Sequence, residues 1–276
     1  MENRFNLVDE DWIPVVDFGR VSLRRVFSDK EIRGLGGNPI QKISLMKLLL
    51  AISQAAYTPK DFEAWKQYNT QSLAEGVLAY LEKHYDKFYL YGEKPFLQMP
   101  QIERAKLQNY GAVLPEIASG NTTILQNLQV EADLDDAEKA LLLVQIGPFS
   151  FSGKKTDNSV VLTPGYRGKT NEKGNPSTGR AGPSLGYAGH LHSYVMGETL
   201  QDTLLLNVIT KNEILRTGIF DNGIGTPPWE KYPTGEDCSV ARDLKKSYMG
   251  RLVPMSRFVL LKEEGLHLSE GIAHMG

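Results

Sequence analysis

The first residues that could do chemistry are Gly168-Lys169-Thr170, which end like the phosphate-binding loop of a nucleotide-hydrolysing enzyme. That motif needs another glycine five residues before Gly168, and the chain has Thr163 there. A strongly apolar strand followed at once by a long helix is also missing around it. We therefore expect no nucleotide-phosphate loop.

A metal site is the second possibility. His190 and His192 would share one face of an extended chain, but zinc needs a third or fourth ligand, and the other histidines have no ligand-like spacing. Acidic residues also gather just before the apolar run 140–146, at Glu131, Asp133, Asp135, Asp136 and Glu138. Acids favour the start of a helix, and their spacing matches no EF-hand loop. We expect a helix N-terminus here, and no metal or other cofactor.

Nucleophilic catalysis is the third possibility. Cys238 is the single cysteine, so the chain can form no intramolecular disulfide, and its pairing with any distant histidine is unspecific. No Gly-x-Ser-x-Gly motif is present for a serine hydrolase. We expect no catalytic residue, so the chain is predicted not to be an enzyme.

Residues 153–189 have the most unusual composition in the chain. They hold eight glycines, three prolines and six Lys or Arg against two acids, so the segment is +4 in a protein of net charge −2. Glycine lets a backbone approach a ligand closely, and basic side chains neutralise phosphates without reading sequence. The segment suits an anionic polymer, although a solvated loop has the same composition. Its candidate contacts to a DNA backbone are Lys154, Lys155, Arg167 and Lys169.

The elements that must position this segment are mixed. Short strands are expected within the first 23 residues, with a turn at Asp17-Phe18-Gly19, and a β-hairpin near 257–268. Helices are expected over about 41–56, from a cap at Thr58 to about Tyr85, and over Thr199–Leu215. The aromatic residues of 88–96 lack interleaved positive charge, so they favour a core over a base-stacking surface. The absence of a regular βαβ order predicts an α+β fold with short sheets, several helices and long loops.

Length and hydropathy bound the remaining classes. The longest apolar runs, 45–52 and 140–146, are too short to span a membrane, and the first residues show no export signal. A cytoplasmic protein without a membrane partner is the expectation.

A set of short stretches then occurs in an order that matches a known family. These are Phe5-Asn-Leu-Val-Asp-Glu-Asp-Trp12-Ile-Pro-Val, Val21-Ser-Leu-Arg, Ile32-Arg-Gly-Leu-Gly-Gly-Asn-Pro39, Lys94-Pro-Phe-Leu-Gln98, Thr203-Leu-Leu-Leu-Asn207-Val, Pro227-Pro-Trp-Glu230 and Arg251-Leu-Val-Pro-Met-Ser-Arg257. Together they resemble the large subunit, CasA, of the CRISPR type I-E Cascade surveillance complex. The resemblance covers essentially all of 1–276, read as one α+β domain, but only about the N-terminal half of a typical member. The family's C-terminal helical bundle, Lys finger and Gln wedge would fall beyond Gly276.

The resemblance implies a role in nucleic-acid recognition. Such a subunit recognises the protospacer-adjacent motif of double-stranded target DNA, helps to open the duplex for the guide CRISPR RNA, and recruits a CRISPR-associated helicase–nuclease. By alignment, its glycine-rich motif-reading loop lies at Gly179, Arg180, Ala181 and Gly182, where Arg180 and Ala181 interrupt the glycines. A second family loop, which contacts guide RNA and other Cascade subunits, would lie at Ile124, Leu125, Gln126, Asn127 and Leu128.

Two other functions stay open from the sequence. The chain could be a purely scaffolding subunit that docks guide RNA or other subunits without reading target DNA. It could also be a metal nuclease that uses His190, His192 and the acids at 131–138, which the incomplete ligand set disfavours.

Overall fold

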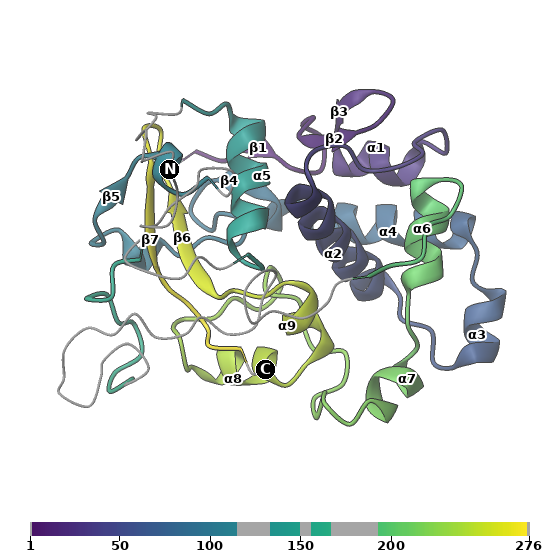
Figure 1. Cartoon of the computed structure of the whole chain (residues 1–276). Helices are drawn as coiled ribbons and strands as arrows, with labels where there is room; N and C mark the ends of the chain where they lie inside the picture. Colours follow the sequence, from purple (N-terminus) through teal and green to yellow (C-terminus); the bar gives the residue numbers. More distant parts are fainter. Residues whose placement is uncertain (1, 115–132, 150–155, 167–192, 275–276) are drawn as a thin grey trace, which may run out of the picture.

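The chain forms a mixed structure of helices and short antiparallel sheets in the computed structural model (Figure 1). The structure describes residues 2–114, 133–149, 156–166 and 193–274. Within these ranges the predicted α+β class is confirmed, since runs of helices accompany short antiparallel sheets and no parallel βαβ unit is present.

The strands form small sheets at separate places. The N-terminal strand β1 (Arg4–Asn6) pairs with β4 (Tyr89–Tyr91), and β2 (Ile13–Val15) pairs with β3 (Gly19–Val21). The predicted turn joins β2 to β3, where Gly19 has a φ of +76°, a conformation that favours glycine. The largest sheet has the order β5-β7-β6, from β5 (Leu107–Gln108), β7 (Leu266–Glu270) and β6 (Arg257–Leu261). Its β6–β7 pair confirms the predicted C-terminal hairpin.

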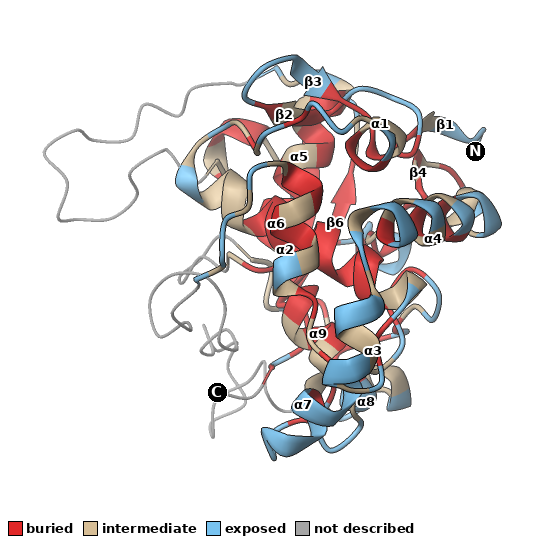
Figure 2. Ribbon diagram, turned by 90° about the vertical axis from the view of Figure 1, so that its right-hand side faces the viewer, coloured by how far each residue is buried: buried red, intermediate tan, exposed pale blue. Residues whose placement is uncertain are grey.

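Helix α2 (Pro39–Ala56) is the central element of the fold. Asn38 caps it by accepting a hydrogen bond from the Gln41 backbone N–H at 2.9 Å, and Pro39 occupies its first position. An unbroken run from Ser44 to Gln54 is buried, so the helix is covered on all sides rather than along one stripe. It packs on helices α4, α5, α6 and α9 (Figures 1 and 2).

The remaining helices surround α2 and the large sheet. They are α1 (Leu23–Ser28), α3 (Phe62–Gln67), α4 (Thr70–Lys83), α5 (Asp136–Ile146), α6 (Leu200–Asn207), α7 (Lys211–Arg216), α8 (Ser239–Lys245) and α9 (Tyr248–Leu252), with single 3₁₀ turns at Tyr85–Lys87, Pro100–Ile102 and Tyr110–Ala112. The prediction of an N-cap at Thr58 is wrong. Thr58 instead donates its hydroxyl to the Gln54 carbonyl at 2.6 Å, and Asp61 caps α3.

Two predicted long helices are each divided. The stretch from Thr58 to Tyr85 breaks between α3 and α4, where Asn69 accepts a hydrogen bond from the Ser72 N–H and starts a new helix. The stretch Thr199–Leu215 breaks between α6 and α7, because Thr210 and Glu213 form a second capping box. Capping side chains therefore set the helix boundaries.

The buried side chains form a main cluster around α2 and a smaller one beside the hairpin β6–β7. The predicted burial of the 88–96 aromatics is confirmed for Phe88 and Phe96. Their rings lie 5.2 Å apart and both contact Trp229. No helix among the described residues is long and apolar enough to cross a membrane.

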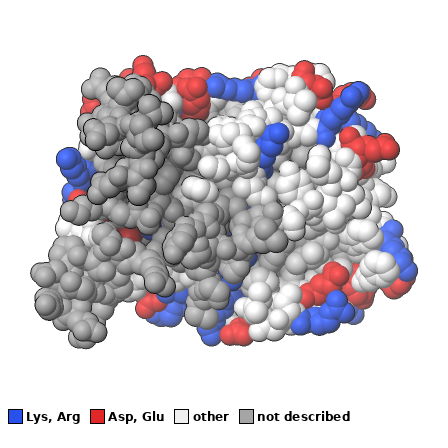
Figure 3. Space-filling view, in the orientation of Figure 1, with Lys and Arg blue, Asp and Glu red and all other residues white. Residues whose placement is uncertain are grey.

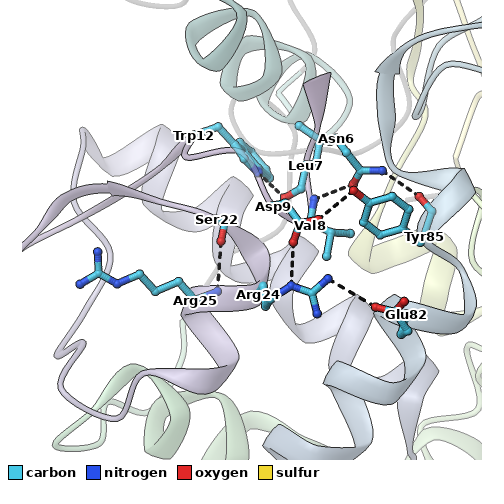
Figure 4. A network of polar contacts seen from close by, with 10 residues as sticks. All are labelled: Asn6, Leu7, Val8, Asp9, Trp12, Ser22, Arg24, Arg25, Glu82 and Tyr85. Carbon is cyan, nitrogen blue, oxygen red and sulfur yellow. Dashed lines mark hydrogen bonds and ion pairs between the residues drawn. The ribbon is translucent and has the colours of Figure 1, made fainter. Parts of the chain in front are cut away.

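A polar network holds the N-terminal segment to α1 and α4 (Figure 4). The Arg24 Nε donates to Asp9 Oδ1 at 2.6 Å, and the Tyr85 hydroxyl donates to Asp9 Oδ2 at 2.8 Å. The hydrogen bond from Arg24 holds the pKa of Asp9 below its usual range. Beneath it, the fully buried Trp12 donates its indole N–H to the Leu7 carbonyl at 3.0 Å. We call this set, with Asn6 and Glu82, the N-terminal network.

Candidate nucleic-acid interface

The residues predicted from sequence to bind nucleic acid lie outside the described residues. They are Lys154, Lys155, Arg167, Lys169, the motif-reading residues Gly179, Arg180, Ala181 and Gly182, and the second-loop residues Ile124, Leu125, Gln126, Asn127 and Leu128. His190 and His192 lie there too. The structure does describe the chain that leads into and out of 167–192. We call residues 156–166 the entry stem and residues 193–199 the exit stem.

A buried carboxylate fixes the entry stem. Glu236 is 0 % exposed, and its side chain accepts hydrogen bonds from the backbone N–H groups of Leu162, at 3.0 Å, and Thr163, at 2.7 Å. The Thr163 hydroxyl in turn accepts from the Asp237 N–H at 3.1 Å. Charge-assisted hydrogen bonds of this kind are about twice as strong as neutral ones. The entry stem is therefore held near its end by the Glu236 carboxylate and by the Asp237 backbone N–H.

The start of the entry stem lies along the large sheet. The Asp157 N–H donates to the Leu268 carbonyl of β7 at 2.9 Å, and Asp157 Oδ2 accepts from the Lys106 N–H at 3.1 Å. Arg104 donates to the Val161 carbonyl at 2.9 Å, and the Val160 side chain is buried in the smaller cluster. The stem is thus part of the packed body.

The exit stem is pressed against α6. Asn207 accepts a hydrogen bond from the Val195 N–H at 2.9 Å and donates to the Val195 carbonyl at 2.7 Å. The Gly197 N–H donates to the Thr203 hydroxyl at 3.0 Å. A Cβ on Gly197 would lie 2.5 Å from the Asp202 Cβ, so only glycine fits there without a shift. Thr203 and Asn207, both from one stretch that carries the resemblance, are therefore stem anchors.

The acidic cluster is a helix start, as predicted. Asp135 accepts from the Glu138 N–H at 2.7 Å, and Glu138 accepts from the Asp135 N–H at 2.9 Å, which completes a capping box for α5. Arg20 pairs with Asp135 at 2.6 Å, and Arg4 pairs with Asp136 at 2.6 Å. Glu131 lies outside the described residues. Within the part that is described, no three His, Cys, Asp or Glu side chains gather to hold a metal ion.

Cys238 has a structural position. It caps α8, and its Sγ accepts from the Ala241 and Thr234 N–H groups, each at 3.4 Å. Burial alone would raise the pKa of this thiol, but these backbone hydrogen bonds lower it overall. The capping contacts give this cysteine a structural role.

A cavity of about 330 Å³ lies between two stretches that carry the resemblance. Its walls include Phe96, Gln98 and Trp229. Behind them, the Trp229 indole N–H donates to the Tyr80 hydroxyl at 2.7 Å, which donates to Glu230 at 2.5 Å. Gln98 is occupied at both ends, by the Leu90 carbonyl and the Leu261 N–H. These contacts join distant segments of the body.

Glu236, Gly197 and Asn207 are the site-positioning residues that sequence reasoning missed. Glu236 acts on residues more than seventy positions earlier in the chain, so no local pattern points to it. Asn207 lies inside a stretch already singled out, but no sequence pattern links it to Val195, which lies twelve residues earlier.

Solved structures share this fold. Over 97 % of this chain and 52 % of the other, the structure is similar to Thermobifida fusca Cse1, with a TM-score of 0.73 and 26 % identity. Thermus thermophilus CasA (Cse1) gives a TM-score of 0.64 and 22 % identity, over 99 % of this chain and 53 % of that one. A chain of a structure named CRISPR RNA-guided surveillance complex gives a TM-score of 0.64 at 18 % identity, over 96 % and 56 %. The fold is that of the N-terminal portion of these large α+β proteins.

Sequence comparison assigns the family. Residues 6–273 match the family model for CRISPR-associated protein Cse1, so the chain belongs to this family. The CRISPR-associated protein CasA/Cse1 of Thermus thermophilus is 31 % identical over 150 residues, which are 50 % of this chain and 29 % of that protein. The chain spans about half the length of the solved relatives that it matches.

Proposed function

We propose that this chain is a non-catalytic, nucleic-acid-binding subunit of a guide-RNA surveillance complex of the Cascade type. Its membership of the Cse1 family over 6–273 carries this proposal. In the proposed complex its partners are guide CRISPR RNA, the other Cascade subunits, double-stranded target DNA and a CRISPR-associated helicase–nuclease. Residues 1–276 act in it as a single α+β domain.

The proposed task is to recognise the protospacer-adjacent motif and to aid duplex opening and helicase–nuclease recruitment. The stems support this proposal. Both ends of the glycine-rich basic segment leave the body at points fixed by Glu236 and Asn207. A segment anchored at both ends loses less conformational entropy on binding than a free one. In such systems protein reads the short motif and base pairing reads the target.

Charge reversal tests the contact with DNA. We expect Lys154, Lys155, Arg167 and Lys169, each changed singly to Glu, to weaken binding of a target duplex to the assembled complex. Each lost phosphate contact should reduce the salt slope by about one unit. Lys30→Glu is the matched control, because Lys30 is an exposed lysine two residues after the end of α1. Unchanged duplex affinity in all four variants would favour the scaffolding role instead.

Glycine replacement tests motif reading. We expect Gly179→Leu and Gly182→Leu to reduce the discrimination between duplexes with and without the motif more than they reduce non-specific affinity. A Leu side chain blocks close backbone approach to a groove. Competition binding with both duplexes measures the ratio. Equal losses for both duplexes would refute insertion of this loop into the groove.

A further inference from the structure

Helix α3 carries aromatic side chains at the edge of the main core cluster, against which Trp65 packs while only partly buried. None of its six residues is buried, yet it holds Phe62 and Trp65. Phe62 is 57 % exposed, and Tyr57, just before the helix, is 43 % exposed. Figure 2 shows that most residues of α3 and of the neighbouring α7 are exposed. Large apolar side chains gathered on a surface mark an interaction site more often than singly scattered ones do.

The rings are arranged as a platform. Phe62 and Trp65 are nearly parallel, at 9°, with centroids 5.8 Å apart, so the exposed Phe62 ring stacks on the partly buried Trp65 ring. The Lys66 ammonium lies 4.6 Å from the centre of the Phe62 ring. Beside them, Tyr57 packs on Tyr68 at 4.9 Å. We call Tyr57, Phe62, Trp65 and Tyr68 the α3 platform.

Positive charge borders this platform. The start of α7 is hydrogen-bonded to the start of α3, because the Lys211 N–H donates to the Pro59 carbonyl at 2.8 Å and the Asn212 N–H donates to the Lys60 carbonyl at 3.1 Å. Lys60, Lys211 and Arg216 are all exposed, and none of the three forms an ion pair with another described residue.

The acids at the same corner are already engaged. Asp61 caps α3, Glu63 pairs with Lys66 at 3.0 Å, and Glu213 is held by the Thr210 hydroxyl at 2.8 Å. The charges left for a ligand are therefore positive. On the face of the molecule shown in Figure 3, basic and acidic side chains lie near one another around the margin.

We propose that the α3 platform binds single-stranded nucleic acid without reading its sequence. Exposed aromatic rings bordered by basic side chains are the combination that stacks bases and neutralises phosphates in such sites. Phe88 and Phe96 of the 88–96 stretch are buried, whereas 57–68 interleaves four aromatic residues, of which Tyr57 and Phe62 are exposed, with Lys60 and Lys66. An acidic peptide would match the charge but would leave the flat rings without a stacking partner. This site is separate from the duplex-binding segment proposed above and goes beyond that function.

Tryptophan fluorescence of the whole chain gives the first test. Of the three tryptophans, Trp12 is fully buried and Trp229 is 5 % exposed, so quenching by a stacked base reports mainly on Trp65. We expect an oligothymidylate of about twelve nucleotides, within the usual range of site sizes, to quench the fluorescence saturably. Trp65→Phe should remove most of this response and keep the affinity within about threefold, since a phenyl ring still stacks. No quenching, or the same quenching in Trp65→Phe, would overturn the proposal.

Matched variants give the second test. We expect Phe62→Ala to weaken oligothymidylate binding about fivefold or more, and Lys60→Glu to weaken it and flatten its salt dependence. The control is Phe18→Ala, because Phe18 is also exposed, at 41 %, and also stacks with a cation, Arg25, at 4.7 Å. An equal effect of the two Phe→Ala changes would overturn the proposal. Unfolding in urea should show wild-type stability for Phe62→Ala and for Phe18→Ala.

The same variants separate this site from the duplex site. We expect Phe62→Ala to leave binding of a motif-containing duplex within about twofold of wild type, and Lys169→Glu to leave oligothymidylate binding equally unchanged. If Phe62→Ala does not weaken oligothymidylate binding while Lys169→Glu still weakens duplex binding, the α3 platform proposal is wrong. If Phe62→Ala weakens oligothymidylate binding but the duplex effects are absent, the proposed motif-reading function is wrong. If Phe62→Ala instead disrupts subunit assembly while oligothymidylate does not bind, the platform is a protein contact and the proposal is wrong.

Discussion

The N-terminal network and the α3 platform use the same residue types in opposite ways. In the network, Trp12 is buried and its indole N–H is bonded to Leu7, and Arg24 is paired with Asp9 (Figure 4). At the platform, the Trp65 indole N–H has no hydrogen-bond partner in the described chain, and Lys60 has no carboxylate partner there. A buried donor without a partner costs stability. The platform is therefore not optimised for folding.

The difference between the N-terminal network and the α3 platform distinguishes residues that stabilise the fold from residues available for binding. Polar groups that are satisfied inside the protein have little left to offer a ligand, whereas the exposed Lys60, which has no carboxylate partner in the described chain, can still pair with one. The polar side chains in the stretches that carry the family resemblance mostly form hydrogen bonds inside the protein. Trp12, Asn207 and Trp229 all make internal hydrogen bonds. The stretches that carry the resemblance thus contain residues that stabilise the fold rather than residues that are free to contact a ligand.

The largest expected contrast is in unfolding free energy. Trp12→Ala removes a fully buried ring and its hydrogen bond, and should destabilise the chain by about 3–5 kcal/mol. Phe62→Ala should change the same quantity by about 0.5 kcal/mol or less, since Phe62 is an exposed surface residue. Urea unfolding at one pH measures both. Comparable losses would mean that the α3 platform belongs to the core.

A smaller effect is expected at the entry stem. Glu236→Gln keeps the shape but gives up the charge that the Leu162 and Thr163 N–H groups bind, and should cost about 1–3 kcal/mol. Hydrogen exchange should show lost protection at these two amides. The control is Glu63→Gln, where an exposed ion pair is worth about 1 kcal/mol or less. Retained protection in Glu236→Gln would show that other contacts hold the stem.

The smallest expected effect depends on pH. The pKa of Asp9 is lowered in the folded chain, chiefly by Arg24. Its stabilising effect is therefore present above the unfolded-state pKa of about 3.9, and is lost as pH falls through the lower folded pKa. Both partners are partly exposed, so Asp9→Asn should cost about 1 kcal/mol or less near neutral pH. Urea unfolding of both forms at neutral and low pH should show the difference shrink. A difference independent of pH would contradict this role of the charge.

Much of the body could be predicted because its signals are local. The helix over about 41–56 and the helix start in the acidic cluster follow from local patterns, and the β6–β7 hairpin follows from its alternation. The break before α7 carried a local signal as well, since Thr210-x-x-Glu213 is a capping box. The break before α4 depends on Asn69, which competes with helix continuation by capping the next turn.

The site is predicted less completely because its supports are distant in sequence. Glu236 meets Leu162 and Thr163 only after the chain has folded, and Asn207 meets Val195 across a turn and a helix. The residues expected to contact DNA, including Gly179 and Gly182, lie outside the described residues and stay predictions. The α3 platform was hidden for another reason. Its aromatics fit an ordinary amphipathic helix until their exposure is known.

The burial of α2 on all sides has a consequence for biosynthesis. Its partners α5, α6 and α9 follow much later in the chain, and α9 begins at Tyr248. At ordinary synthesis rates, the ribosome needs roughly ten to forty seconds to pass from the end of α2 to α9. Throughout that interval α2 can pack on α4, which follows it closely, but it lacks its full cover. Part of this apolar helix therefore stays exposed on the nascent chain, and the packing around α2 is completed only after α9 has emerged.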